Sequence, residues 1–340
     1  EVHRGGQGVV YRAVQTGTGR RVAVKMLARG AFASDRQRQR FQREIETAAR
    51  LNHPSIVTVY ETGALPGGRA GYVMEFIDGQ RLGEWASGLR TPVDRRAFSE
   101  LLRRKLAVFL DICDAVQHAH DHGVIHRDLK PDNILVDATD QPHVLDFGIA
   151  KALGGGDREH AGQPAHTHTG EFVGTIRYAS PEQLSGRPDD VDARTDVYAL
   201  GVLLYELITG EHPQPQSDSV EAAIRAIREF EPRRPEAADQ RLDADLGTIA
   251  LTAMAKDADR RYQSAGALAE DVRRYLAGQA IDARRDCAWY VLRKAARRHR
   301  TRVLLGGAVS LSLVALAAWL SVLYSQAESR RHQTRQALTE

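Results

Sequence analysis

One short polar run between two aliphatic segments constrains this chain more than any other feature. Asp128 lies five residues before Asn133, with Lys130 between them. The flanking residues, 123–125 and 134–136, have the character of short buried strands. A carboxylate can accept a hydroxyl proton, and an amide oxygen nearby can hold a hard cation. The run therefore combines the side chains that a hydroxyl-directed transfer reaction needs.

The run 126–133 resembles the catalytic loop H-R-D-L-x-x-x-N of the protein kinase family, and Asp146-Phe147-Gly148 follows in the family's order. The resemblance implies an α+β, bilobal protein-kinase fold, with a small β-rich N-lobe over residues 1–76 and a large helical C-lobe over 77–277. It also implies ATP as phosphoryl donor, Mg²⁺ as cofactor, and protein Ser or Thr hydroxyls as acceptors.

In that comparison each polar residue of the run has a role. Asp128 is the catalytic base, and Lys130 neutralises charge on the transferred phosphoryl group. Asn133 and Asp146 are the Mg²⁺ ligands. His126 is expected to pack and hydrogen-bond beneath the loop rather than act as the base.

A glycine-rich turn is expected near the amino end, at Gly5, Gly6 and Gly8. Glycines let backbone N–H groups approach phosphates without a Cβ in the way. The family pattern G-x-G-x-x-G-x-V is matched by Gly5, Gly8 and Val10, whereas His3 takes the place of the first glycine. A plain hairpin turn is the alternative, because a glycine loop alone is weak evidence. The chain opens inside this motif, so the N-lobe is expected to be truncated.

A strand and a helix follow that turn. Residues 21–25 alternate like a half-buried strand and end at Lys25, which resembles the family's V-A-I-K. The spacing of apolar residues predicts a helix over 41–51. By resemblance, Glu44 pairs with Lys25 and directs its ammonium group at the α and β phosphates, while Glu46 is the alternative carboxylate on the opposite face.

Strands are predicted at residues 56–61 and 70–76, and the second resembles the strand that enters the interlobe hinge. Met74 then lies beside adenine, and Glu75 and Ile77 present backbone C=O and N–H to its edge. The expected nucleotide-binding set is Gly5, Gly6, Gly8, Val10, Ala23, Lys25, Glu44, Met74, Glu75 and Ile77.

Three histidines, His118, His120 and His122, lie near the carboxyl end of a predicted helix. Alternate residues of a helix do not share one face, which disfavours a metal site. We therefore interpret them as the solvated end of that helix.

Residues 146–182 are rich in Gly, His and Thr and lack periodicity, so they resemble an activation segment. A phosphate on Thr167 or Thr169 is expected to pair with Arg127, and this T-x-T element resembles that of bacterial receptor-type kinases. An unregulated flexible segment is the alternative.

Four further residues have expected supporting roles. Thr175 resembles the residue that hydrogen-bonds the catalytic Asp and Lys in Ser/Thr kinases. Glu182 is expected to pair with Arg261, with Arg260 as the rival partner. Asp196 begins a predicted buried helix and is expected to hold the backbone of the catalytic loop.

The carboxyl-terminal part differs in composition from the rest. Residues 303–324 carry no charge, and as a helix they would rise about 33 Å, enough to span a bilayer core. A buried core helix is the alternative. The residues before the run, in the juxtamembrane segment 278–302, are more basic than the tail 325–340, which places the kinase domain in the cytoplasm. The basic residues are Arg284, Arg285, Arg293, Lys294, Arg297, Arg298, Arg300 and Arg302 before the run, and Arg330, Arg331 and Arg335 after it.

These features together predict a single-pass, membrane-anchored Ser/Thr kinase that is regulated by activation-loop autophosphorylation, resembling the bacterial receptor-type kinases. Gly306 and Ser310 form a small-xxx-small pair, so a homodimer for trans-autophosphorylation is left open. The 325–340 tail is expected to be extracytoplasmic and incomplete. Charge is nearly balanced, 47 Lys and Arg against 44 Asp and Glu, which gives no reason to expect a nucleic-acid partner. The alternative function is a nucleotide-binding pseudokinase scaffold, supported only by His3.

Overall fold

The computed structural model describes residues 1–5, 8–27, 35–65, 69–147, 176–185, 187–217 and 219–285, together with 313, 316 and 319–321. The chain divides into two compact units, Glu1–Leu276 and Ala277–Glu340. In the second unit the structure describes the short 3₁₀ helix η5 (Asp282–Arg284). All residues of the candidate site belong to the first unit.

The predicted membrane span, residues 303–324, lies outside the described residues except at 313, 316 and 319–321. Within the described ranges, no helix combines the length and the apolar character needed to cross a membrane. The span therefore stays a prediction.

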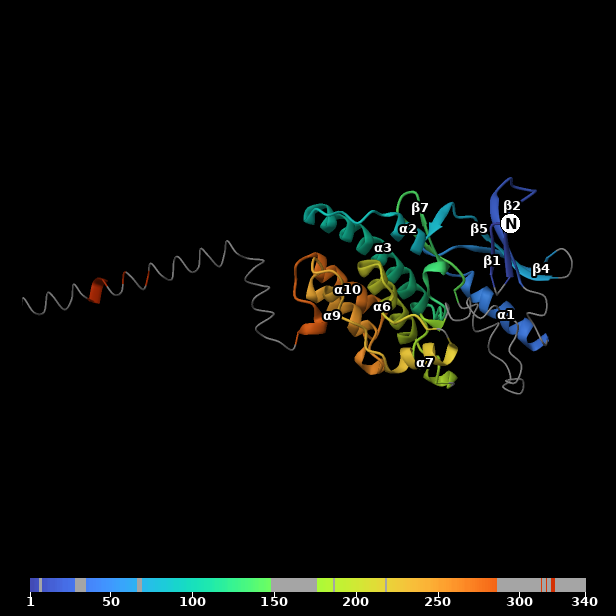
Figure 1. The fold of residues 1–340 in the computed structure, drawn as a ribbon. Helices are drawn as coiled ribbons and strands as arrows, with labels where there is room; N and C mark the ends of the chain where they lie inside the picture. The colour runs from blue at the N-terminus through green and yellow to red at the C-terminus, as the bar shows by residue number, and fades with distance from the viewer. Residues whose placement is uncertain are drawn as a thin grey trace, which may run out of the picture. The chain divides into compact units, whose positions relative to one another are not determined.

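An antiparallel five-stranded sheet with helix α1 beside it forms the amino-terminal part of the first unit (Figure 1). The strands in spatial order are β1 (His3–Gly5), β2 (Gly8–Val14), β3 (Arg21–Leu27), β5 (Arg69–Glu75) and β4 (Val59–Leu65). Helix α1 spans Asp35–Ala48, and its Phe41 and Ile45 join Ala23, Tyr72 and Met74 in one apolar core cluster. The inner face of the sheet and one face of α1 are thus buried against each other.

Helices dominate the remainder of this unit (Figure 1). Helix α6 is buried along almost its whole length, from Thr195 to Ile208, and α3, α9 and α10 surround it. Such a helix needs apolar residues on every face, as its sequence has. The described helices are α2 (Leu82–Gly88), α3 (Arg95–Asp121), α6 (Arg194–Thr209), α7 (Val220–Glu229), α8 (Pro235–Ala238), α9 (Ala244–Ala253) and α10 (Ala265–Leu276).

A small second sheet carries the candidate catalytic loop. It consists of β6 (Gly79–Arg81), β7 (Ile134–Asp137) and β8 (Pro142–Val144), in that order. Val144 also exchanges backbone hydrogen bonds with the segment before β4: its N–H donates to the Ser55 carbonyl at 2.8 Å, and its carbonyl accepts from Val57 N–H at 3.0 Å. These bonds tie the amino-terminal sheet to the strand that precedes Asp146.

The bilobal arrangement of a β-rich part and a helical part is confirmed. Several predicted boundaries differ: α1 begins at Asp35 rather than Phe41, and β5 spans Arg69–Glu75 rather than 70–76. Helix α1 ends at Ala48 rather than Leu51, because the chain tightens into a turn in which Leu51 N–H donates to the Ala48 carbonyl at 3.1 Å. The strand predicted at 56–61 begins only at Val59, since Ile56 makes an isolated bridge to Val144 instead.

Candidate active site

The loop between α3 and β7 brings three predicted catalytic side chains together. Lys130 Nζ lies 3.0 Å from Asp128 Oδ2. Asn133 Nδ2 donates to the Asp128 carbonyl at 2.7 Å and to Asp128 Oδ2 at 3.1 Å. The side chain of Asp128 remains 16% exposed. The carboxylate is therefore held by two neighbours and still open to a substrate.

Asp196, at the start of α6, fixes the backbone of this loop. Its Oδ2 accepts from His126 N–H and its Oδ1 from Arg127 N–H, both at 2.8 Å. The Arg127 carbonyl accepts from Gln183 Nε2 at 2.7 Å. Arg127 has a φ of 67°, which is costly for a residue with a side chain, so its backbone needs these bonds to stay in place.

His120 contacts Asp196, so the prediction that the three histidines form a solvated helix end is wrong for His120. Its side chain is only 5% exposed, and its Nε2 lies 2.7 Å from Asp196 Oδ2. Burial would raise the pKa of Asp196, but the hydrogen bond and charge of His120, the charge of His126 and the Arg127 N–H together hold it below the usual value. Only His122 of the three is exposed.

His126 lies beneath the loop, as predicted for a packing residue. It is fully buried, its Nε2 is 2.8 Å from the Leu145 carbonyl, and its ring meets Phe147 edge-on at 4.8 Å. Its Nδ1 accepts from the backbone N–H of Asp128 at 3.3 Å. Both ring nitrogens thus face backbone groups, which suits a structural role better than a catalytic one.

Asp146 follows β8 and faces the amino-terminal sheet. Its Oδ2 lies 2.5 Å from Lys25 Nζ, and the Tyr72 hydroxyl donates a short hydrogen bond to its Oδ1. Burial would raise the pKa of Asp146, yet the Lys25 charge and the hydrogen bonds from Lys25 and Tyr72 hold it below the ordinary value. The carboxylate is accordingly kept ionised, the form that binds a cation.

Lys25 and Glu44, the pair predicted to direct an ammonium group at the nucleotide phosphates, lie on β3 and on helix α1. Lys25 is 7% exposed in β3, and Glu44 is half-buried on the face of α1 that turns toward the core. Glu46 is exposed, as expected for the alternative carboxylate on the opposite face. The pairing of Lys25 with Glu44 stays a prediction.

Four residues of the predicted nucleotide-binding set lie in or against one apolar cluster. Ala23 and Met74 are cross-strand partners in β3 and β5, each 6% exposed, and Val10 and Ile77 pack against them. Glu75 N–H donates to the Thr58 carbonyl at 2.9 Å within the sheet. The contact of the Glu75 carbonyl with adenine stays a prediction.

Gly8 is required by the close approach of β2 and β3. Its φ is +150°, and a Cβ there would lie 2.1 Å from the Met26 carbonyl oxygen. Gly5 pairs with Gly8 across the β1–β2 hairpin, while His3 pairs with Val10 in the same ladder. The described residues on either side of this turn are thus paired in one antiparallel ladder, and Val10 packs against the apolar cluster.

A buried ion pair supports the loop from the carboxyl-terminal side. Arg261 Nη1 and Nη2 contact Glu182 Oε1 and Oε2 at 2.7 and 2.8 Å, and the Arg261 side chain is 0% exposed. Thr195, next to Asp196, donates to the same Glu182 at 2.9 Å. Arg260 is exposed, so the guanidinium seated on Glu182 is that of Arg261.

Several predicted residues lie outside the described residues: Gly6, Gly148, Thr167, Thr169 and Thr175. Their roles stay predictions.

Sequence reasoning missed two functional contacts, those of Tyr72 and His120. Each joins residues far apart in the chain, 74 positions for Tyr72–Asp146 and 76 for His120–Asp196. For Tyr72 a signal existed, since it alternates with Met74 on one face of the predicted strand.

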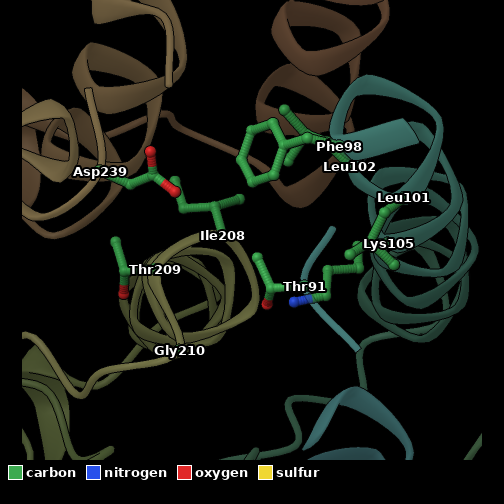
Figure 2. A pocket seen from close by; sticks show the side chains of 9 residues that line it. All are labelled: Thr91, Phe98, Leu101, Leu102, Lys105, Ile208, Thr209, Gly210 and Asp239. Carbon is green, nitrogen blue, oxygen red and sulfur yellow. The ribbon is translucent and has the colours of Figure 1, made fainter. Parts of the chain in front are cut away.

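A cavity of about 60 Å³ lies elsewhere, between α3 and the end of α6 (Figure 2). Phe98, Lys105, Thr209 and Asp239 are among the residues that line it, and none of the candidate catalytic residues is. Lys105 Nζ donates to the Leu207 carbonyl at 2.9 Å, and burial lowers the pKa of Lys105. The ammonium group of Lys105 therefore already has an acceptor in this cavity.

The arrangement of these residues agrees with comparisons to known proteins. A family model described as "Protein kinase domain" matches residues 1–271. The chain belongs to the protein kinase family. The curated relatives that match it include proteins described as serine/threonine-protein kinases.

The curated relatives include the serine/threonine-protein kinase PknB of Mycobacterium tuberculosis, 39% identical over 284 residues that cover 82% of this chain and 42% of PknB. The probable serine/threonine-protein kinase SCO3848 of Streptomyces coelicolor is 40% identical over 284 residues, 82% of this chain and 40% of that protein. The kinase chain thus spans about two-fifths of the length of these relatives. The crystal structure of the M. tuberculosis PknI kinase domain has a TM-score of 0.60 and 27% identity, covering 81% of this chain and 93% of that chain.

The donor set of this kinase domain suits Mg²⁺. Asp146 offers an ionised carboxylate, and Asn133 uses its amide nitrogen for Asp128, which leaves the amide oxygen as the atom that suits a hard cation.

Proposed function

We propose that this chain transfers the γ-phosphoryl group of ATP to Ser or Thr hydroxyls of proteins. The observation that carries the proposal is the Asp128 carboxylate held between Lys130 and Asn133, with Asp146 presented by Lys25 and Tyr72. Residues of these types in this arrangement serve positioning and charge neutralisation, which supply most of the catalysis in phosphoryl transfer.

In the proposed reaction the oxygen of the substrate hydroxyl bonds to the γ phosphorus of ATP, and Asp128 accepts the proton of that hydroxyl. The bond between the γ phosphorus and the bridging oxygen breaks, which releases ADP. Lys130, 3.0 Å from Asp128, neutralises charge on the transferred group. Lys25 directs its ammonium group to the α and β phosphates.

Asn133 and Asp146 would hold Mg²⁺, which when bound neutralises charge on the phosphates. Asp196, in contact with His120, holds the backbone N–H groups of His126 and Arg127, which directly precede Asp128. The short anchored loop thus leaves little geometry to be arranged at the moment of transfer.

The acceptor class is tested with radiolabelled ATP and paired peptides that differ only in one Ser, Thr or Tyr. We expect label on the Ser and Thr peptides. Equal or greater label on the Tyr peptide would contradict the proposed acceptor class.

We also propose that the kinase domain works on the cytoplasmic face of a membrane, anchored by residues 303–324. The uncharged run and the basic residues before it support this placement. Deleting residues from 303 onward should release the protein from membranes, whereas continued sedimentation with membranes would contradict the anchor.

Regulation by phosphorylation of Thr167 or Thr169 is a separate proposal. The supporting observation is the position of Arg127 beside Asp128, with its backbone fixed by Asp196 and Gln183. Phosphopeptide mapping of the active protein should find one of these threonines modified. If both are unmodified and alanine replacements leave activity unchanged, the proposal is wrong.

A further inference from the structure

Two residues that face each other across the amino-terminal sheet share one carboxylate. Lys25 of β3 and Tyr72 of β5 are direct cross-strand partners, and Lys25 Nζ lies 5.9 Å from the centre of the Tyr72 ring. Lys25 Nζ donates to Asp146 Oδ2, and the Tyr72 hydroxyl donates to Asp146 Oδ1. Among the described residues, Lys25 and Tyr72 thus each donate to a different oxygen of the carboxylate.

The two donors differ in how far they can move. Tyr72 is 1% exposed and belongs to the apolar cluster with Ala23, Met74 and Ile45. Its hydroxyl position follows from two side-chain torsions that close packing restricts. Lys25 has a flexible four-carbon stem. When Lys25 turns to nucleotide phosphates, as proposed above, Tyr72 is the donor that stays on Asp146.

Asp146 needs such a donor. Its backbone has a φ of 61°, a conformation that few residues with a side chain adopt, and its terminal torsion has a broad, weakly defined minimum. A carboxylate with one oxygen fixed by a rigid neighbour keeps its plane. Each carboxylate oxygen offers about two lone pairs, so one bond from Tyr72 still leaves sites for a cation.

We propose that Tyr72 is a positioning residue that orients the Asp146 carboxylate for Mg²⁺. The proposal rests on the proposed kinase function, because it assumes that Asp146 is the Mg²⁺ ligand. It differs from a locking role, in which the hydroxyl would compete with the cation and its removal would tighten metal binding.

The test is Mg²⁺-dependent binding of ADP to the full chain, which needs no turnover. Calorimetry measures ADP affinity in chelator and across a Mg²⁺ titration, for wild type, Tyr72→Phe and the control Tyr60→Phe. Tyr60 lies in β4 of the same sheet and is 40% exposed. The phenylalanine variants remove only a hydroxyl.

For Tyr72→Phe we expect the Mg²⁺ concentration that gives half of the affinity gain to rise about ten-fold, while ADP affinity in chelator changes less than about two-fold. Tyr60→Phe should match wild type. Tyr72→Met, which fills similar space without a hydroxyl, repeats the measurement if the phenylalanine variant is unstable.

The positioning role is overturned if the half-maximal Mg²⁺ concentration of Tyr72→Phe equals or lies below that of wild type. It is also overturned if the ADP affinity of wild type does not depend on Mg²⁺. Phosphotransfer by the wild type reports on the proposed function separately. No transfer by wild type at saturating Mg²⁺ overturns that function, whereas transfer with an unchanged titration overturns only the role of Tyr72.

Discussion

Replacing Asp196 by asparagine tests how the catalytic loop is held. The Asp196 carboxylate is buried and accepts two backbone N–H groups, from His126 and Arg127, at 2.8 Å each. An asparagine amide has one oxygen, so one of those N–H groups would face an NH₂ group and lose its acceptor. A buried donor without an acceptor costs about 1–3 kcal/mol, and the bond that remains loses its charge assistance. We expect Asp196→Asn to lower the free energy of unfolding by about 3 kcal/mol.

The loss should reach the chemistry as well, because Asp128 is two residues from His126 on the loop that Asp196 anchors. Displacement of a catalytic group by a fraction of an ångström is costly, so we expect kcat to fall at least about ten-fold. The KM for ATP should change little, since the proposed nucleotide-binding residues lie between Gly5 and Ile77, outside the catalytic loop. Urea unfolding and steady-state phosphotransfer measure the two effects. The matched control is Asp189→Asn, because Asp189 is an exposed carboxylate in the same unit.

If the free energy of unfolding of Asp196→Asn is within about 0.5 kcal/mol of the wild-type value and kcat is unchanged, the anchoring role of Asp196 is refuted. The contribution of His120 follows from a double-mutant cycle with His120→Gln. Because His120 Nε2 lies 2.7 Å from Asp196 Oδ2, the two substitutions should be non-additive.

Three further predictions concern the frame of the site. Glu182→Gln removes the charge that faces the fully buried Arg261 side chain and should cost about 3 kcal/mol by urea unfolding; a loss below about 0.5 kcal/mol would contradict the structural role of the pair. Burial and the nearby Arg177 charge lower the pKa of His212 to about 4. As the pH falls, the unfolded chain therefore protonates His212 at a higher pH than the folded chain does. The free energy of unfolding should fall by up to about 3 kcal/mol between about pH 6.5 and about pH 4. Urea unfolding across that range should show a weaker decline in His212→Gln, and an identical decline would refute the assignment. Gly8→Ala places a Cβ 2.1 Å from a backbone oxygen and should weaken ADP binding in a fluorescence titration at least about ten-fold; unchanged binding would show that the hairpin tolerates the change.

The candidate site was predictable where its chemistry is local in sequence. Asp128, Lys130 and Asn133 lie within six positions of one another, and the loop that joins them is too short to separate them. The apolar periodicity of the sequence also predicts helices at 220–230 and 265–276, and α7 and α10 occupy these ranges to within one residue.

The buried polar contacts of Tyr72 and His120 were not predicted, whereas the resemblance to the kinase family predicted the Glu182–Arg261 pair and the anchoring role of Asp196. His120 has the spacing of a solvated helix end, and only the approach of α6 turns it into a partner for Asp196. Tyr72 has the pattern of a core aromatic residue, which it is, but its hydroxyl needs a partner when buried and finds Asp146 across the interlobe connection. Hydrophobic periodicity predicts which face of a helix or strand is buried. It does not predict which polar group of a distant segment contacts that face.

The central claim is that Asp128 carries out γ-phosphoryl transfer in this chain. The direct measurement is single-turnover transfer of label from radiolabelled ATP to a Ser/Thr peptide by wild type and by Asp128→Asn, with ADP affinity measured in parallel. The account predicts transfer by wild type and at least about a thousand-fold slower transfer by the variant, with ADP affinity retained. Transfer by Asp128→Asn at the wild-type rate would contradict the assignment of the base, and no transfer by wild type with ADP still bound would favour the pseudokinase alternative.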